Sequence, residues 1–153
     1  MQPVIVSRDK DLMQLIDDDV LYWDFGKSQP QNKKNLEDKL EIQCSQLADF
    51  FALVGDSSDN IPGVDGIGVT IARQLLSFFP DVESIIEHLD QLEDLPIRGA
   101  GKLADKINMS KDQILLSKQL ATIVTDIDDG PDVNELAWKG CLLYTSDAAD
   151  EED

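Results

Sequence analysis

Four aspartates in two short segments have the residue types and the spacing to bind a divalent cation. Asp56 and Asp59 are three residues apart, and Asp9 and Asp11 are two residues apart, directly after an apolar run. Carboxylate oxygens are the ligands that Mg²⁺ and Mn²⁺ prefer, and a hard cation needs several of them at once. The sequence therefore suggests a magnesium or manganese site built from these four side chains.

A glycine-rich segment follows the second aspartate pair. It contains Gly63, Gly66 and Gly68 within six residues. A turn without Cβ atoms lets backbone amides approach a phosphate oxygen closely. A metal site beside a phosphate-binding turn is what an enzyme that cleaves phosphodiester bonds requires.

Each of these motifs also has a purely structural interpretation. An aspartate at the start of a helix commonly caps it, which would account for Asp9 and Asp11. The Asp-Ser-Ser-Asp run at 56–59 is ordinary turn composition, and a glycine turn can simply join two packed helices. Both interpretations stay open for each motif alone, and the proximity of the motifs favours the chemical one.

Apolar patterning and turn residues predict the elements that must position these side chains. We expect two strands, a buried one over 4–7 and another over 20–23. Ser45 is expected to cap a helix that ends at Val54, and Ser110 is expected to open the longest helix, at about 111–124. The remaining expected helices begin at Asp9 or cover 35–40, 68–79, 82–89 and 101–107.

The composition is that of a globular chain. At 153 residues with 42% hydrophobic residues, it is long enough for a domain with a real core. No apolar run has the length of a membrane span, and no signal peptide opens the sequence. Cys44 and Cys141 are far apart without metal-type spacing, so we expect free thiols in a cytoplasmic protein.

The net charge of −18 is unusual for a protein that binds nucleic acid, for which a basic surface is the usual expectation. Part of the excess is local, because five acidic residues fall within the last seven positions. Divalent cations among the aspartates would offset more of it, two charges for each ion. The acidic surface would also suit a protein-interaction domain, which stays an alternative.

Three segments carry a resemblance to a known family. Leu53–Gly68, which reads LVGDSSDNIPGVDGIG, resembles the metal- and DNA-binding motif of bacterial 5'-nucleases. These are the 5'-3' exonucleases, the flap endonucleases and the 5'-nuclease domain of DNA polymerase I. Val4–Leu15, which reads VIVSRDKDLMQL, resembles the family's strand with its Asp-Lys-Asp turn, and 95–100 with 119–126 are a weaker match.

The resemblance implies an α/β fold, the C-terminal part of a PIN-like 5'-nuclease. It implies a remnant of the nuclease core over 1–54, then a helix-three-turn-helix element and a mostly helical C-terminal lobe over 55–139. We interpret residues 140–153 as a non-native or disordered acidic tail. The chain would be a fragment truncated at its N-terminus. We expect the protein to be bacterial, cytoplasmic and monomeric.

The resemblance also implies an activity, that of a structure-specific 5'-3' exonuclease or flap endonuclease that hydrolyses DNA with 5' flaps or 5' ends. Asp9, Asp11, Asp56 and Asp59 match one half of the family's acid cluster for a two-metal mechanism. The missing N-terminal portion would supply the other half. We therefore expect the isolated chain to be inactive or nearly so.

The DNA-binding residues implied by the resemblance lie in the helix-three-turn-helix element. Gly66 and Gly68 would present amides to a phosphate at the start of a helix, and the backbone carbonyls of Val64 and Ile67 would hold a K⁺ ion. The full set of expected DNA contacts is Gly63, Gly66, Ile67, Gly68, Thr70 and Arg73.

One departure from the family concerns charge at this element. The family usually has Lys-Thr where this chain has Thr70-Ile71. Arg73 is expected to substitute for that lysine, and Asp65 adds a negative charge that should weaken binding. A second alternative is a helix-hairpin-helix module that binds DNA without catalysis, in which the turn is retained but the metal site is never completed.

Overall fold

A computed structural model describes residues 2–26, 29–127, 130 and 133–137 of the chain. The chain divides into two units, Met1–Ile123 and Val124–Asp153. The described part of the second unit contains the 3-10 helix η4 (Val133–Leu136). The acidic tail expected over 140–153 lies outside the described residues.

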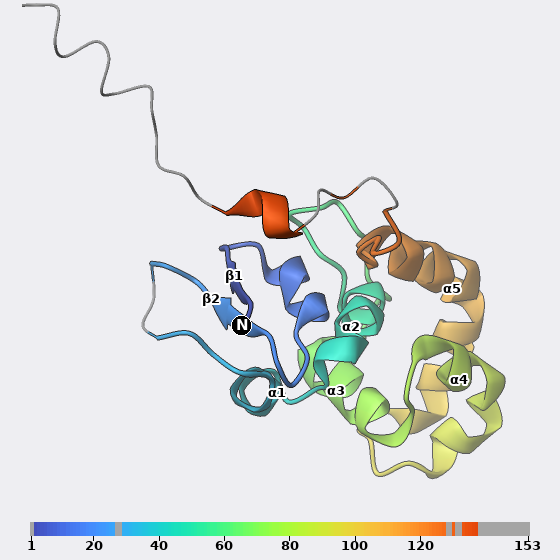
Figure 1. The fold of residues 1–153 in the computed structure, drawn as a ribbon. Helices are drawn as coiled ribbons and strands as arrows, with labels where there is room; N and C mark the ends of the chain where they lie inside the picture. Colours follow the sequence, from blue (N-terminus) through green and yellow to red (C-terminus); the bar gives the residue numbers. More distant parts are fainter. Residues whose placement is uncertain (1, 27–28, 128–129, 131–132, 138–153) are drawn as a thin grey trace, which may run out of the picture. The chain divides into compact units, whose positions relative to one another are not determined.

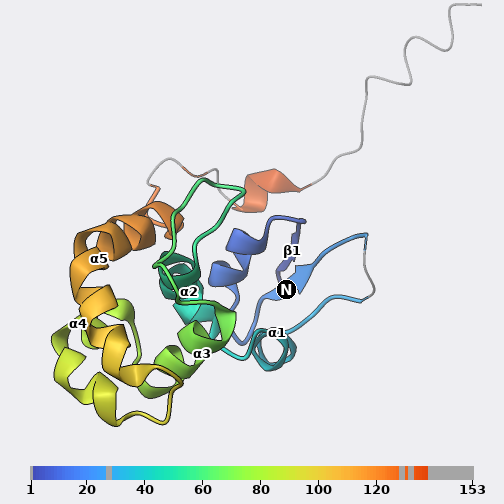
Figure 2. The ribbon, with the colours of Figure 1, turned by 180° about the vertical axis from the view of Figure 1, so that it is seen from behind.

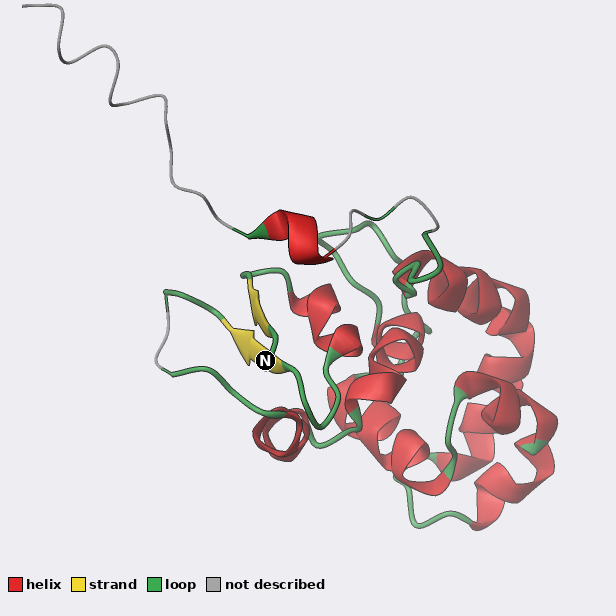
Figure 3. Ribbon diagram, in the orientation of Figure 1, coloured by secondary structure: helices red, strands yellow, loops and turns green. Residues whose placement is uncertain are grey.

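The first unit is mostly helical, with one small sheet (Figures 1 and 3). Its strands are β1 (Val4–Val6) and β2 (Leu21–Trp23). Its α-helices are α1 (Lys33–Leu40), α2 (Leu47–Val54), α3 (Val69–Phe78), α4 (Val82–Glu87) and α5 (Ala100–Ala121). Its 3-10 helices are η1 (Lys10–Leu15), η2 (Cys44–Gln46) and η3 (Leu89–Asp94).

The two strands pair in parallel, with Val4 opposite Leu21 and Val6 opposite Trp23. Both expected strands are present, but β1 is not buried as predicted. Val4 and Val6 are 43% and 56% exposed. Within the described residues the sheet has only these two strands, and Val4 and Val6 lie on a face of β1 that is largely open to solvent. A continuous apolar run is typical of a strand covered on both faces, which explains the wrong expectation.

Two helix starts differ from the expectation. The helix after β1 is the 3-10 helix η1, and Asp9 caps it as its carboxylate accepts the Asp11 N–H at 3.0 Å. Ser45 does not cap α2, because the chain enters α2 through η2. In η2, Gln46 Oε1 accepts the Gln43 N–H at 3.1 Å. The side chain that stabilises the entry to α2 is therefore a glutamine and not the expected Ser45.

The core of the first unit forms around α2. This helix packs against η1 on one side and against α3 and α5 on another (Figures 1 and 2). Its Ala52 and Leu53 are fully buried, as are Leu75 of α3, Ile85 of α4 and Ile107 of α5. The core is therefore continuous across residue 54, where the sequence predicts the boundary between two segments; that boundary stays a prediction.

The helix α5 is one continuous helix of 22 residues, which corrects the two helices expected at 101–107 and 111–124. Ser110 does not start a helix; it lies in the interior of α5. Leu103, Ile107 and Ile114 are buried at helical spacing against the rest of the core. Their packing continues the helix through residues 108–111 (Asn-Met-Ser-Lys), where the sequence predicts a break between two helices.

A buried ion pair links three of these helices. Asp49 of α2 is 3% exposed, and its Oδ1 accepts the Val82 N–H at the start of α4 at 2.9 Å. Lys118 of α5 binds the same carboxylate oxygen at 2.8 Å and Glu83 of α4 at 2.5 Å. These contacts fix α5 beside α2, and α5 in turn reaches the loop that follows α2.

Asp81→Ala should lower the free energy of unfolding by about 1 kcal/mol at neutral pH, because Asp81 caps α4. Hydrogen bonds from the Ser84 hydroxyl and amide hold the pKa of Asp81 below its ordinary value of 3.8. The stabilisation is therefore present above that ordinary value and is lost as the pH falls through the lower folded-state pKa.

Urea unfolding at neutral pH and at about pH 3 measures this effect. Asp81→Asn is the control, since asparagine keeps the cap acceptor without the charge. A deficit in Asp81→Ala that is as large in acid as at neutral pH would contradict this assignment.

Candidate metal centre and DNA-binding turn

The loop that follows α2 holds two of the predicted aspartates. Asp56 and Ile61 exchange two backbone hydrogen bonds of 2.8 Å, which close the loop. Within it, Asp56 Oδ1 accepts the Ser58 N–H at 3.0 Å and the Ser58 hydroxyl at 2.6 Å. Asp56 is 7% exposed and Asp59 is exposed, so the loop presents one fixed and one accessible carboxylate.

The structure brings three of the four predicted aspartates together. Oxygen atoms of Asp11, Asp56 and Asp59 lie within 4.8 Å of one another. Asp11 comes from η1, which packs against α2 and so meets the loop at the C-terminal end of α2. Asp9 lies outside this cluster, because its carboxylate caps η1. We call Asp11, Asp56 and Asp59 the carboxylate cluster.

A lysine ammonium contacts the cluster directly. Lys10 forms an ion pair with Asp56 Oδ2, donates to the Ser58 hydroxyl at 3.0 Å and lies 5.0 Å from the centre of the Phe51 ring. Burial opposes ionisation of Asp56, but Lys10 and Ser58 outweigh burial and hold the pKa of Asp56 below its ordinary value. The site therefore keeps Asp56 ionised and already contains one cation.

The donor set fits a hard divalent cation. Asp11 Oδ1 is buried and has no hydrogen-bond partner among the described residues. Burial raises the pKa of Asp11, and the charges of Asp9 and Asp59 raise it further. A cation bound between the three carboxylates would satisfy the buried oxygen and relieve the repulsion.

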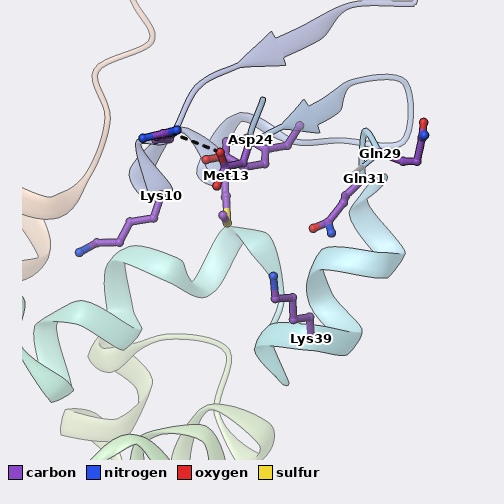
Figure 4. A pocket seen from close by; sticks show the side chains of 8 residues that line it. Lys10, Met13, Asp24, Gln29, Gln31 and Lys39 are labelled. Carbon is purple, nitrogen blue, oxygen red and sulfur yellow. Dashed lines mark ion pairs between the residues drawn. The ribbon is translucent and has the colours of Figure 1, made fainter. Parts of the chain in front are cut away.

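A separate pocket of about 210 Å³ lies beside the cluster (Figure 4). Arg8 pairs there with Asp24 at 3.7 Å, and Lys39 extends toward the same space. None of the three cluster carboxylates lines this pocket, although Lys10 does. Its complete lining is Arg8, Lys10, Met13, Tyr22, Asp24, Gln29, Gln31 and Lys39. The pocket and the cluster are therefore different sites.

The glycine turn from Gly63 to Gly68 is packed onto the end of α2. A Cβ at Gly63 would collide with the carbonyl group of Val54, and the Val64 N–H donates to the Leu53 carbonyl at 2.8 Å. Gly66 has a φ of +76°, which favours glycine. Gly68 precedes α3, and a Cβ there would meet nothing within 4 Å, so neither strain nor crowding inside the chain requires a glycine.

Three side chains of α5 bind this turn and the residue that precedes it. Ser117 Oγ donates to the Pro62 carbonyl at 3.4 Å, Gln113 Nε2 to the Gly63 carbonyl at 3.0 Å, and Lys106 Nζ to the Asp65 carbonyl at 2.9 Å. Positions 106, 113 and 117 share one face of a helix. Sequence reasoning missed these residues, since Lys106 joins the face of Gln113 and Ser117 only if α5 continues through residue 110.

Thr70 and Arg73, two of the predicted DNA contacts, differ in whether their side chains are free to bind a phosphate. Thr70 is exposed in the first turn of α3. Arg73 is half-buried, and its guanidinium binds Glu41 at 2.5 Å, while its Nε is buried without a hydrogen-bond partner among the described residues. Arg73 is therefore held by an acid of the neighbouring segment and is a poor substitute for a free lysine at the start of α3.

The family is decided by a match over most of the chain. Residues 42–142 match the model of the family described as "5'-3' exonuclease, C-terminal SAM fold". The chain belongs to the 5'-3' exonuclease family. The matched segment begins just before α2 and includes Asp56, Asp59 and the complete glycine turn, whereas Asp9 and Asp11 precede it.

Similar proteins agree with this family assignment. The 5'-3' exonuclease of Buchnera aphidicola subsp. Schizaphis graminum is 37% identical over 126 residues, which are 82% of this chain and 44% of that protein. The flap endonuclease Xni of Colwellia psychrerythraea is 31% identical over 147 residues, 96% of this chain and 46% of that protein. The chain thus spans about half the length of these curated relatives.

The fold agrees with that of a solved 5'-exonuclease. The structure of T5 5'-exonuclease with bound zinc aligns with a TM-score of 0.64 at 25% identity, covering 77% of this chain and 42% of that one. The predicted α/β 5'-nuclease fold is confirmed. Among the described residues, the helices are too short or too polar to cross a membrane.

Proposed function

We propose that this chain is the part of a structure-specific 5'-3' exonuclease or flap endonuclease that binds duplex DNA and supplies half of the metal site. The observation that carries the proposal is the carboxylate cluster of Asp11, Asp56 and Asp59, two of which directly precede a glycine turn whose Asp65, Gly66 and Gly68 are exposed. The substrate would be DNA with 5' flaps or 5' ends. The names of the relatives support this substrate class.

The cluster would hold Mg²⁺ or Mn²⁺. When bound, a pair of such ions would supply a hydroxide nucleophile and stabilise the charge that develops on the scissile phosphate. Asp56 is positioned by Ser58, Asp59 is exposed, and Asp11 contributes a buried oxygen that has no hydrogen-bond partner among the described residues. Asp9 stays a predicted ligand, and its carboxylate would have to give up the hydrogen bond by which it caps η1. The other half of the cluster would come from a portion of the enzyme outside this chain.

The glycine turn would bind the DNA backbone. The first amides of α3 have no side-chain cap, because Gly68 precedes the helix, and a helix N-terminus favours an anion. Gly63, Gly66 and Ile67 shape the turn, and Thr70 offers a hydroxyl beside it. Contacts of this kind recognise the phosphate backbone and its shape, without reading bases.

A K⁺ ion at the carbonyls of Val64 and Ile67 would support the same contact. Both side chains are buried, so the core fixes the positions of their carbonyls. The Val64 carbonyl accepts the Ile67 N–H at 2.9 Å and keeps a second lone pair. We also propose that the protein is a cytoplasmic monomer in bacteria, as the sequence predicts.

Gly68→Ala should weaken binding of a 5'-flap duplex by about tenfold, the value of one charge-assisted hydrogen bond. The added Cβ would meet no other atom of the chain within 4 Å, so it would obstruct only an approaching phosphate. Fluorescence anisotropy at low salt with Ca²⁺, which is expected to permit binding without cleavage, measures the affinity. The same titration with NaCl in place of KCl tests the K⁺ proposal.

Gly101→Ala is the matched control, because it adds the same methyl group to an open position of α5. Wild-type affinity in Gly68→Ala would remove the turn from the DNA interface. A wild-type chain that binds no DNA at low salt would contradict the proposed function and favour an acidic protein-interaction domain.

A further inference from the structure

We propose that Lys106 of α5 supplies the positive charge that binds a DNA phosphate at the glycine turn. The inference rests on the proposed DNA-binding function of this turn. Lys106 Nζ donates to the Asp65 carbonyl at 2.9 Å. It also lies over Gly66, in the space that a Cβ at Gly66 would fill. The ammonium is therefore part of the turn itself, although it comes from a residue 40 positions later in the chain.

The charges around the turn leave a role for such a cation. The first turn of α3 carries Thr70 and Ile71, which are uncharged, and Asp65 adds a carboxylate. Arg73 is occupied by Glu41. Within the described residues, Lys106 is the basic side chain that hydrogen-bonds to the turn. Without it, a phosphate would meet backbone amides beside a negative side chain in a chain of net charge −18.

The position of Lys106 is fixed by the packing of α5 in the core and by the hydrogen bonds of α5 to the loop. Leu103 and Ile107, on either side of it in α5, are buried in the core. Gln113 and Ser117 bind the preceding carbonyls of the loop from the same face of α5. The ammonium has three donors, and the Asp65 carbonyl accepts one of them. Donors remain for a phosphate oxygen without the cost of ordering a free lysine.

Two variants distinguish a role of the Lys106 charge in DNA binding from a role of its hydrogen bond in holding the turn. Lys106→Gln keeps an N–H donor for the Asp65 carbonyl and removes the charge, whereas Lys106→Arg keeps the charge. Lys111→Gln is the control, since Lys111 is an exposed lysine of the same helix. Affinity for a 5'-flap duplex is measured by anisotropy over a series of KCl concentrations, and thermal unfolding is followed for each variant.

Lys106→Gln should bind about tenfold more weakly at low salt, with a slope of log affinity against log salt smaller by about one. Lys106→Arg should retain most of the affinity and the slope, and Lys111→Gln should match the wild type. A Lys106→Gln variant with an unchanged slope would overturn the inference, even if its affinity falls with its stability. A wild-type chain that binds no DNA would overturn the proposed function itself.

Discussion

Asp59→Asn and Asp11→Asn are each expected to weaken Mn²⁺ binding by at least about tenfold. The three cluster carboxylates lie within 4.8 Å of one another, and Asp11 has a buried oxygen without a hydrogen-bond partner among the described residues. Removing one charge takes away a ligand and part of the repulsion that a cation would relieve. Electron paramagnetic resonance of free Mn²⁺ measures the affinity directly.

Asp112→Asn is the matched control, because Asp112 is an exposed aspartate of α5 outside the cluster. Asp9→Asn separates two roles, since asparagine keeps the cap of η1 while losing the charge. A loss in Asp9→Asn like that in Asp11→Asn would make Asp9 a ligand, and unchanged affinity would leave it a cap. Equal Mn²⁺ affinity in Asp59→Asn, Asp112→Asn and wild type would contradict the proposed metal centre.

Gly63→Ala should destabilise the protein by about 3 kcal/mol or more, and should abolish binding of both DNA and Mn²⁺ at the loop. A Cβ at Gly63 would collide with main-chain atoms of Val54 and Gly55, which cannot move as a side chain could. Relief would require the loop to leave the end of α2. Urea unfolding followed by circular dichroism measures the change.

The control is again Gly101→Ala, which adds a methyl group where nothing lies within 4 Å. It should leave stability unchanged or raise it by up to about 1 kcal/mol, since alanine is the better helix residue. A Gly63→Ala variant as stable as Gly101→Ala would show that the contact between the turn and α2 is loose. The positions of the carboxylate cluster would then need another explanation.

Local features of the site could be predicted from the sequence. The glycine turn, the helix that follows it and the Asp56–Asp59 loop lie within one short segment, where turn residues decide the backbone. The helix expected over 68–79 is present as α3. The family assignment followed from the same segment, and the family match confirms it.

Features that depend on tertiary packing could not be predicted. Whether Asp9 or Asp11 faces the cluster depends on the backbone angles of η1, which spacing alone does not fix. The continuity of α5 depends on the burial of Ile107 and Ile114 against helices far away in sequence. The contacts of Lys106 with the turn depend on that continuity, so local sequence patterns could not predict them.

A titration of ¹⁵N-labelled protein with a 5'-flap duplex, observed by amide NMR, tests the central claim most directly. The account predicts that amide signals of Gly66, Gly68 and Thr70 shift the most, because the phosphate would bind there. Added Mn²⁺ should broaden the signals of Asp11, Asp56 and Asp59 in the same sample. Largest shifts outside the turn, or broadening centred away from these aspartates, would contradict the account.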